Sequence, residues 1–153
     1  MSFIHKSVWV QFLITLFIGY QYIDSFIYLY ESHQLTNDGY TELLLFTAFQ
    51  LVILNIAVHT IVAILSNKDE LEQQSDERDE LISLKGGNMA YNTLSTWVVI
   101  VLVSLWATSL ENARYYFDTL SGEYNVLNIL LVGFLVAELL RFATQLYHYQ
   151  KGV

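Results

Sequence analysis

Long apolar stretches alternate with short polar ones along the whole chain. The clearest apolar stretch covers residues 43–65, which contain no Asp, Glu, Lys or Arg. As a helix, these 23 residues rise about 35 Å, which exceeds the bilayer hydrocarbon core of about 30 Å. Comparable apolar stretches occupy residues 8–30, 90–110 and 125–148. The pattern predicts an all-α polytopic membrane protein in which four helices form a transmembrane bundle.

The polar segments between these stretches predict how the helices pair. The connections at 31–42 and 111–124 are short, and short connections favour antiparallel neighbours. We therefore expect two helical hairpins within a single transmembrane domain that covers residues 1–153. The longest polar segment, about 67–87, is predicted to be a helical loop outside the bilayer. Gly86 and Gly87 should break or hinge the chain before the third span.

Positive charges predict the orientation, because Lys and Arg concentrate on the cytoplasmic side of a membrane protein. Four spans place five of them on the side of both termini: Lys6, Lys68, Arg78, Lys85 and Lys151. The opposite side has only Arg114, so we expect both termini in the cytoplasm. The first apolar stretch continues past residue 20 and lacks a small-residue cleavage pattern, which indicates a retained span. Tyrosines such as Tyr28, Tyr40 and Tyr124 are expected to anchor the outer interface.

Composition argues against several functional classes. The chain has no Cys, which excludes disulfides and thiolate nucleophiles, and its four His residues are too scattered to suggest a metal set. No Gly-rich phosphate loop, His-Glu-x-x-His motif or Ser-His arrangement is present. The net charge of −8 disfavours nucleic acid as a partner. We therefore expect a protein without catalytic activity and without a cofactor or metal.

Polar residues inside the spans are costly in lipid and mark the candidate site. Glu138 and Arg141 are three residues apart, so they can pair on one helix face, and Gln145 continues that face. Asn55 and His59 fall at matching depths in the second span, which runs in the same direction. The sequence predicts one buried cluster of these five residues, with Gln50 nearby. It could be a polar latch between helices, a proton or ion path, or a site where Arg141 binds an amphiphile or lipid headgroup.

A separate pair is predicted at the outer side of the bundle. Asp24 lies about 9 Å inside the outer edge of the first span, within reach of Arg114. The two residues could form a structural ion pair or a gate at the outer mouth.

The segment 67–85 contains seven acids and three bases. It could be a solvated helix that joins the two hairpins, or a surface that docks a basic cytosolic partner. Divalent cations are disfavoured because no Asp-x-Asp-x-Asp-Gly loop is present. The docking interpretation assigns the contacts to Asp76, Glu77, Arg78, Asp79, Glu80 and Lys85.

Two motifs carry a resemblance to known sequences. They are D-E-R-D-E-L-I at 76–82, followed by Lys85 and Tyr91, and A-E-L-L-R-F-A-T-Q-L-Y-H-Y-Q-K-G at 137–152. From about residue 76 onward the chain resembles a group of uncharacterised four-span prokaryotic membrane proteins. A basic residue that is frequent in that group is replaced here by Asn88. Some of those proteins are associated with small helix-turn-helix regulators, so the resemblance implies a membrane-tethered regulatory role.

Two functional hypotheses follow from the sequence. In the first, the protein is a non-catalytic sensor, adaptor or accessory subunit that contacts a cytosolic or membrane protein through its acidic loop. In the alternative, it is a small transporter or channel that works as a homo-oligomer in the lipid bilayer. A proton, an ion or a small amphiphile would then move along the polar seam between spans 2 and 4. An intramembrane enzyme is the least supported class.

Overall fold

The computed structural model describes residues 3–65, 77–108 and 122–151. Four α-helices account for nearly all of them: α1 (Phe3–Glu31), α2 (Asn37–Leu65), α4 (Glu77–Thr108) and α5 (Gly122–Lys151). No strand occurs in these three ranges. The prediction of an all-α four-helix bundle is confirmed, and each predicted span lies within one helix as far as the described residues extend.

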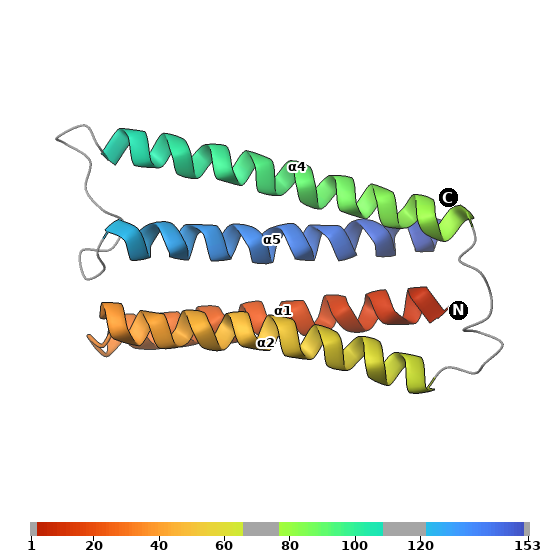
Figure 1. Ribbon diagram of the computed structural model, residues 1–153, viewed down its shortest axis with the longest axis horizontal. Helices are drawn as coiled ribbons and strands as arrows, with labels where there is room; N and C mark the ends of the chain where they lie inside the picture. Colours follow the sequence, from red (N-terminus) through yellow and green to blue (C-terminus); the bar gives the residue numbers. More distant parts are fainter. Residues whose placement is uncertain (1–2, 66–76, 109–121, 152–153) are drawn as a thin grey trace.

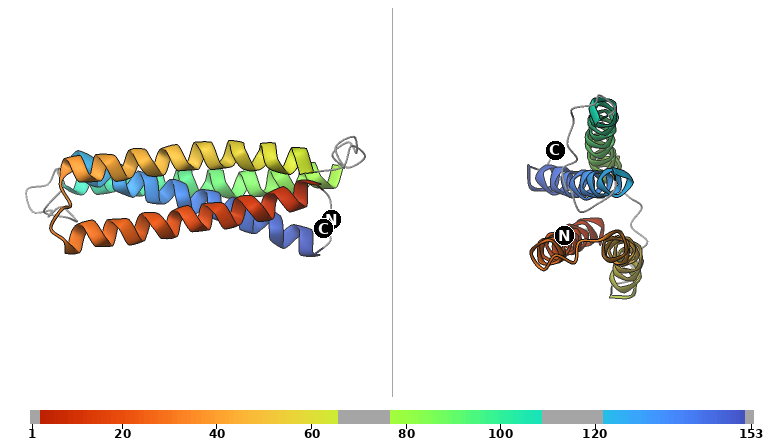
Figure 2. Two further views of the ribbon diagram at one scale, coloured as in Figure 1. Left: turned by 90° about the horizontal axis from the view of Figure 1, so that it is seen from below. Right: turned by 90° about the vertical axis from the view of Figure 1, so that its left-hand side faces the viewer.

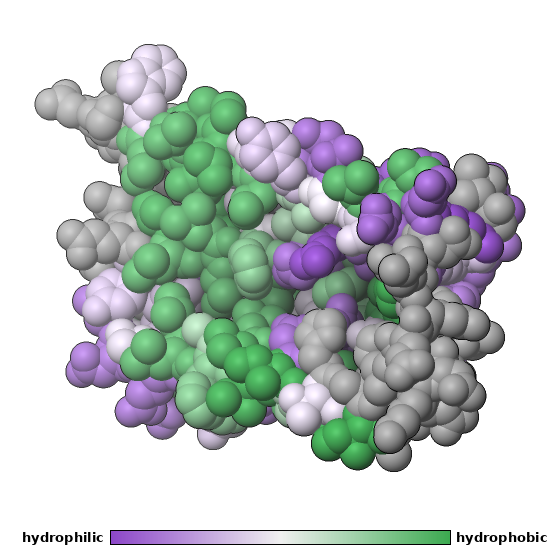
Figure 3. All heavy atoms as spheres, turned by 45° about the vertical axis from the view of Figure 1, so that its right-hand side comes forward, coloured by the Kyte–Doolittle hydropathy of each residue, from purple (hydrophilic) through white to green (hydrophobic). Residues whose placement is uncertain are grey.

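All four helices are long and apolar enough to cross a membrane. The shortest has 29 residues and the longest 32, so each rises more than about 40 Å and projects beyond a bilayer core of about 30 Å. Large apolar side chains such as Phe17, Phe49 and Leu102 are more than half exposed. On the face drawn in Figure 3, hydrophobic side chains cover the middle and hydrophilic ones gather towards both ends. These features indicate a multi-pass membrane protein.

Helix α5 lies at the centre of the bundle (Figures 1 and 2). It packs against α4 on one side and against α1 on the other, whereas α2 packs mainly on α1. Helices α1 and α2 form one antiparallel hairpin, and α4 and α5 form the second antiparallel pair. Both chain termini lie at the same end of the molecule, which we call the terminal end. The opposite end, with the α1–α2 turn, is called the hairpin end.

The turn between α1 and α2 is specified by a few local interactions. His33 adopts a positive φ of 57°, and the amide of Gln34 closes the end of α1 by donating to the Leu29 carbonyl at 2.9 Å. The Thr36 hydroxyl then accepts from the Gly39 amide at 3.3 Å and caps the start of α2. A Cβ on Gly39 would lie 2.8 Å from the Gln34 carbonyl oxygen, so this tight turn requires glycine.

The expected break at Gly86 and Gly87 is wrong. Helix α4 runs without interruption from the acidic segment into the third span. A Cβ on Gly86 would lie 2.6 Å from the Gln145 Cγ and 3.0 Å from the Arg141 carbonyl oxygen. Small residues let membrane helices approach closely. Gly86 is therefore retained by packing of α4 against α5 and not by a hinge.

A second glycine marks the contact between α4 and α5 towards the hairpin end. A Cβ on Gly133 would collide with the indole ring of Trp97. The Trp97 Nε1 donates to the carbonyl oxygen of Ile129 at 2.7 Å. Because Ile129 lies one turn before Gly133, the missing side chain at Gly133 leaves this carbonyl accessible to the indole. The apolar core itself has two clusters, one around Tyr22 and Tyr40 and one around Phe142.

Candidate functional site

The charged pair of the fourth span lies on one face of α5. The Arg141 Nη1 is 3.4 Å from the Glu138 Oε2, one helical turn away. The Arg141 side chain is 41% exposed, and its guanidinium carbon lies 5.4 Å from the centroid of the Phe142 ring. Strong charge-assisted hydrogen bonds are closer to 2.8 Å. The pair is therefore long and open to its surroundings, although it lies well inside a helix that can span a membrane.

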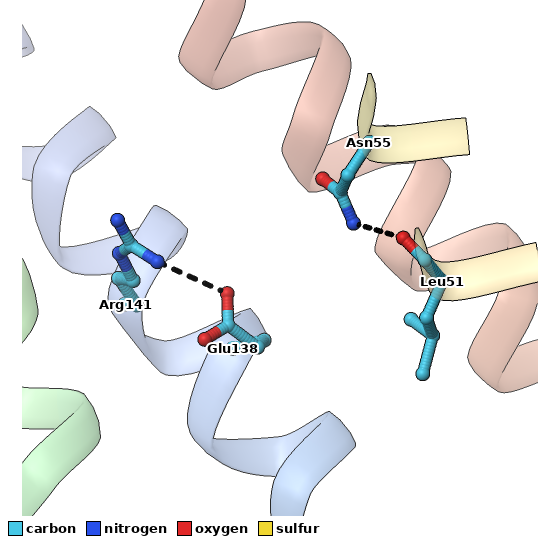
Figure 4. Close-up of polar contacts among 4 residues, drawn as sticks. All are labelled: Leu51, Asn55, Glu138 and Arg141. Carbon is cyan, nitrogen blue, oxygen red and sulfur yellow. Dashed lines mark hydrogen bonds and ion pairs between the residues drawn. The ribbon is translucent and has the colours of Figure 1, made fainter. Parts of the chain in front are cut away.

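A cavity of about 480 Å³ opens beside this pair, between α1, α2 and α5. Its polar lining residues come from all three helices: Gln11, Thr15, Asn55, Glu138 and Arg141. Asn55 donates from Nδ2 to the Leu51 carbonyl at 2.7 Å within α2, and its side chain points across the cavity towards α5 (Figure 4). The structure thus brings Asn55, Glu138 and Arg141 to one cavity, with Asn55 bonded to its own helix.

A smaller cavity of about 190 Å³ continues towards the terminal end, between α1, α4 and α5. Ser7, Gln145 and Tyr149 line it, and Gln11 and Arg141 line both cavities. Gln145, only 4% exposed, therefore faces α1 and α4 and not α2. This location departs from the predicted seam between spans 2 and 4, because the main partner of the polar face of α5 is α1.

The sequence interpretation missed the polar stripe on α1. Ser7, Gln11 and Thr15 follow a spacing of four residues and are at most 7% exposed. This spacing places all three on one helix face. The signal was present in the sequence, since three polar residues at that spacing inside an apolar stretch indicate a buried seam. We call the α1 stripe, Asn55 of α2 and the residues Glu138, Arg141 and Gln145 of α5 the polar seam.

Other predicted cluster residues have different surroundings. Gln50 donates from Nε2 to the Gln21 Oε1 at 3.0 Å, so it joins α2 to α1 away from the ion pair. The side chain of His59 lies outside the described part of the structure, and its role stays a prediction. Asp24 is exposed and lines an α1–α2 groove of about 850 Å³ together with Glu31 and Glu42. Arg114 lies outside the described residues, so the outer pair also stays a prediction.

The acidic docking residues lie in the first turns of α4, except Asp76, which is outside the described ranges. The Tyr149 hydroxyl donates to the Asp79 Oδ1 at 2.8 Å, and the Arg78 Nη2 donates to the Tyr149 carbonyl at 3.5 Å. The Tyr149 ring also stacks on His5, with centroids 4.5 Å apart. Two predicted docking residues therefore hold helix ends together. The exposed ones are Glu77, Glu80 and Lys85, together with Arg78.

A second polar contact lies nearer the hairpin end, where the sequence predicts tyrosines that anchor the outer membrane interface. The Tyr22 hydroxyl donates to the Asn128 Oδ1 at 2.5 Å and lies 3.4 Å from the Tyr40 hydroxyl. Tyr40 is fully buried and packs edge-on against Phe26 and Tyr124. The expectation that Tyr40 anchors the bundle in the outer interface is therefore wrong, because its ring belongs to the core.

Comparisons with protein-family models, curated proteins and solved structures find no match to this chain. Within the described ranges, no group of three or more His, Asp or Glu residues could hold a metal ion. The candidate site therefore rests on its own chemistry. It offers one permanent cation, one carboxylate and several neutral hydrogen-bonding groups beside an apolar wall, which suits binding of a polar or amphiphilic group.

Proposed function

We propose that this chain is a non-catalytic sensor, adaptor or accessory subunit of a prokaryotic inner membrane, with both termini in the cytoplasm. It would contact a partner protein through the exposed charged residues at the start of α4. The supporting charge distribution places Lys6, Arg78, Lys85 and Lys151 at the terminal end. That end would face the cytoplasm.

Tyr149 carries the proposal, because it connects the smaller cavity of the polar seam to the start of α4. The exposed charged residues there, Glu77, Arg78, Glu80 and Lys85, form what we call the docking surface. Tyr149 lines the smaller cavity and also hydrogen-bonds Asp79 at the start of α4. Glu77 and Glu80 lie on the same first turns and are exposed. A change in the occupancy of the seam would therefore act on the first turns of α4 through a direct side-chain contact.

Charge reversal tests the docking surface. We expect Glu77→Lys with Glu80→Lys to abolish recovery of a co-purifying partner in mild detergent, because like charges then oppose a basic partner. The matched control is Glu31→Lys with Glu42→Lys, which changes the same charge at the hairpin end and should leave recovery intact. Equal recovery with both double variants would contradict the docking function.

The orientation has a separate test that exploits the absence of cysteine. In intact cells, a membrane-impermeant maleimide should label Gln34→Cys in the α1–α2 turn. It should not label Lys151→Cys at the end of α5 until the membrane is permeabilised. Labelling of Lys151→Cys alone in intact cells would place the termini outside.

The second candidate function is a small oligomeric transporter or channel, which the polar seam and the outer face of α4 favour. Only 6% of the α4 span is buried. Exposed residues with alternating spacings of four and three follow its side away from α5: Asn88, Asn92, Ser95, Val99 and Leu102. This spacing is typical of helices that pair in a left-handed coiled coil. Amide groups both donate and accept hydrogen bonds, so an identical helix would satisfy them in lipid.

Cysteine cross-linking in native membranes tests this oligomer. Asn92→Cys and Ser95→Cys should form disulfide-linked dimers under mild oxidation. Thr93→Cys, which lies beside Asn92 in the chain but on the side of α4 turned towards α5, should not. Proteoliposome flux of protons and small ions, with Glu138→Gln as the inactive variant, tests transport itself. If none of the cysteine variants forms cross-links, or if Glu138→Gln leaves the flux unchanged, the result contradicts this candidate.

A further inference from the structure

The cavity of about 480 Å³ between α1, α2 and α5 combines a charged end with an apolar wall. At the charged end, Arg141 has five N–H donors, and its described contacts are one carboxylate oxygen at 3.4 Å and the Phe142 ring. Because Arg141 lines both cavities and is 41% exposed, donors that Glu138 does not engage can reach an occupant. The volume of about 480 Å³ lies in the range of small-molecule sites. An occupant with a polar head would satisfy donors that are costly to leave unpaired in a membrane.

The apolar wall shows from which side an occupant enters. Val52 of α2 is 59% exposed and Phe134 of α5 is 41% exposed, and both line the cavity. The cavity therefore opens to the surface between α2 and α5, which pack against each other only sparsely. In a bilayer this surface faces lipid chains. An occupant that enters there has an apolar chain as well as a polar head.

The sign of the head follows from the two charged groups. A carboxyl group can become neutral by accepting a proton, whereas a guanidinium cannot release one in a protein. Among the described lining residues only Glu138 and Arg141 are charged, since α1 contributes Gln11 and Thr15 and α2 contributes Asn55. Helix α4 supplies no lining residue to this cavity. Arg141 is thus the permanent charge of the cavity, and it selects an anionic head.

We propose that this cavity binds a single-chain anionic amphiphile. Its head pairs with Arg141 and its chain lies along Leu131, Phe134 and Val52 in the opening between α2 and α5. At Arg141 the head takes the place of the long contact with Glu138. The inference rests on the proposed function, because it names the ligand class to which the polar seam of such a sensor responds.

Binding is measured on the full chain in phosphatidylcholine nanodiscs with radiolabelled hexadecanesulfonate, a probe that stays anionic at every pH used. We expect one saturable site per chain and at least tenfold weaker binding to Arg141→Gln. Glu138→Gln, which removes the carboxylate that competes for Arg141, should bind at least as tightly as the wild type.

Competitors and control variants show whether the site requires an anionic head and an apolar chain. Unlabelled hexadecanesulfonate should displace the probe, whereas hexadecyltrimethylammonium, acetate and inorganic phosphate should not. Lys151→Gln, which removes a cation at the end of α5 and outside the cavity, should bind normally. Displacement by phosphate or acetate alone would show a site for free anions and overturn the amphiphile. Binding that survives Arg141→Gln, or that Glu138→Gln weakens, would overturn the proposal.

The binding result is separable from the proposed function. If Arg141→Gln does not fold, the affinity of Glu138→Gln relative to that of the wild type still decides the proposal. If the docking variants keep their partner while the probe binds as expected, the sensor function fails and the amphiphile site remains. If the docking variants lose their partner but no probe binds, the sensor function remains and the amphiphile site fails.

Discussion

The α1–α5 interface has two halves that use similar polar residues in different ways. Towards the hairpin end, Tyr22 and Asn128 share a short hydrogen bond inside a buried cluster that also contains Tyr40. Towards the terminal end, Gln11 and Arg141 border two cavities of about 480 and 190 Å³. In the first half the Tyr22 hydroxyl is buried and hydrogen-bonded, and the second half contains space beside charged groups.

This difference shows that polar residues inside a membrane helix do not by themselves mark a functional site. A buried polar group that has a partner costs little and helps to fix helix register. A charged group beside unfilled space keeps its hydrogen-bonding capacity for a ligand, water or ion. We therefore assign a structural role to the Tyr22 contact and a binding role to the cavity around Arg141.

The largest expected effect comes from a matched pair of glycine substitutions at the α4–α5 contact. Gly133→Ala places a methyl group into the Trp97 ring towards the hairpin end, and overpacking of this kind costs about 1–3 kcal/mol. Gly86→Ala, towards the terminal end, meets the Gln145 side chain, which can move into the smaller cavity, and comes within 3.0 Å of the Arg141 carbonyl oxygen. We therefore expect a cost at Gly86 that is lower than the cost at Gly133. Reversible unfolding in mixed micelles measures both, and equal costs would mean that the two ends of the α4–α5 contact are packed alike.

A smaller effect is expected from the Tyr22–Asn128 hydrogen bond. Asn128→Leu leaves the buried Tyr22 hydroxyl without its acceptor and should lower the free energy of unfolding by about 1–2 kcal/mol. Tyr22→Phe together with Asn128→Leu should cost less than the sum of the single changes, because both remove the same bond. Gln145→Leu, the comparison beside the smaller cavity, leaves no buried hydroxyl without its acceptor and should lower the free energy of unfolding less than Asn128→Leu does. Additive single costs would contradict the direct hydrogen bond.

The fold was predictable because apolar length is a strong signal in a membrane protein. Four stretches near or above 20 residues define the helices, and short connections define the hairpins. The spacing of Glu138 and Arg141 also predicts a pair on one helix face, and the structure places their charged atoms 3.4 Å apart. Each of these inferences needs only the geometry of a single helix.

Relations between helices were harder to predict. Equal depth suggested that α2 would face the polar residues of α5, but depth does not determine which neighbour a helix face meets. Rotation of α5 directs Gln145 to α1 and α4, and Gln50 instead bonds Gln21. Tyr40 was assigned to the interface because tyrosines are common there, although the same ring also fits a core when its hydroxyl lies near another. These positions depend on packing between helices, which the periodicity of a single helix does not reveal.

The smallest expected effect is the one that separates a latch from a binding site. Glu138→Gln removes a long ion pair whose side chains are 24% and 41% exposed, and such pairs contribute only about 0–1 kcal/mol. The free energy of unfolding should therefore change less than with Asn128→Leu, while the affinity for an anionic amphiphile should be at least as high as in the wild type. If Glu138→Gln instead destabilises the bundle as much as Asn128→Leu does, the pair holds helices together and the contrast between the two halves disappears.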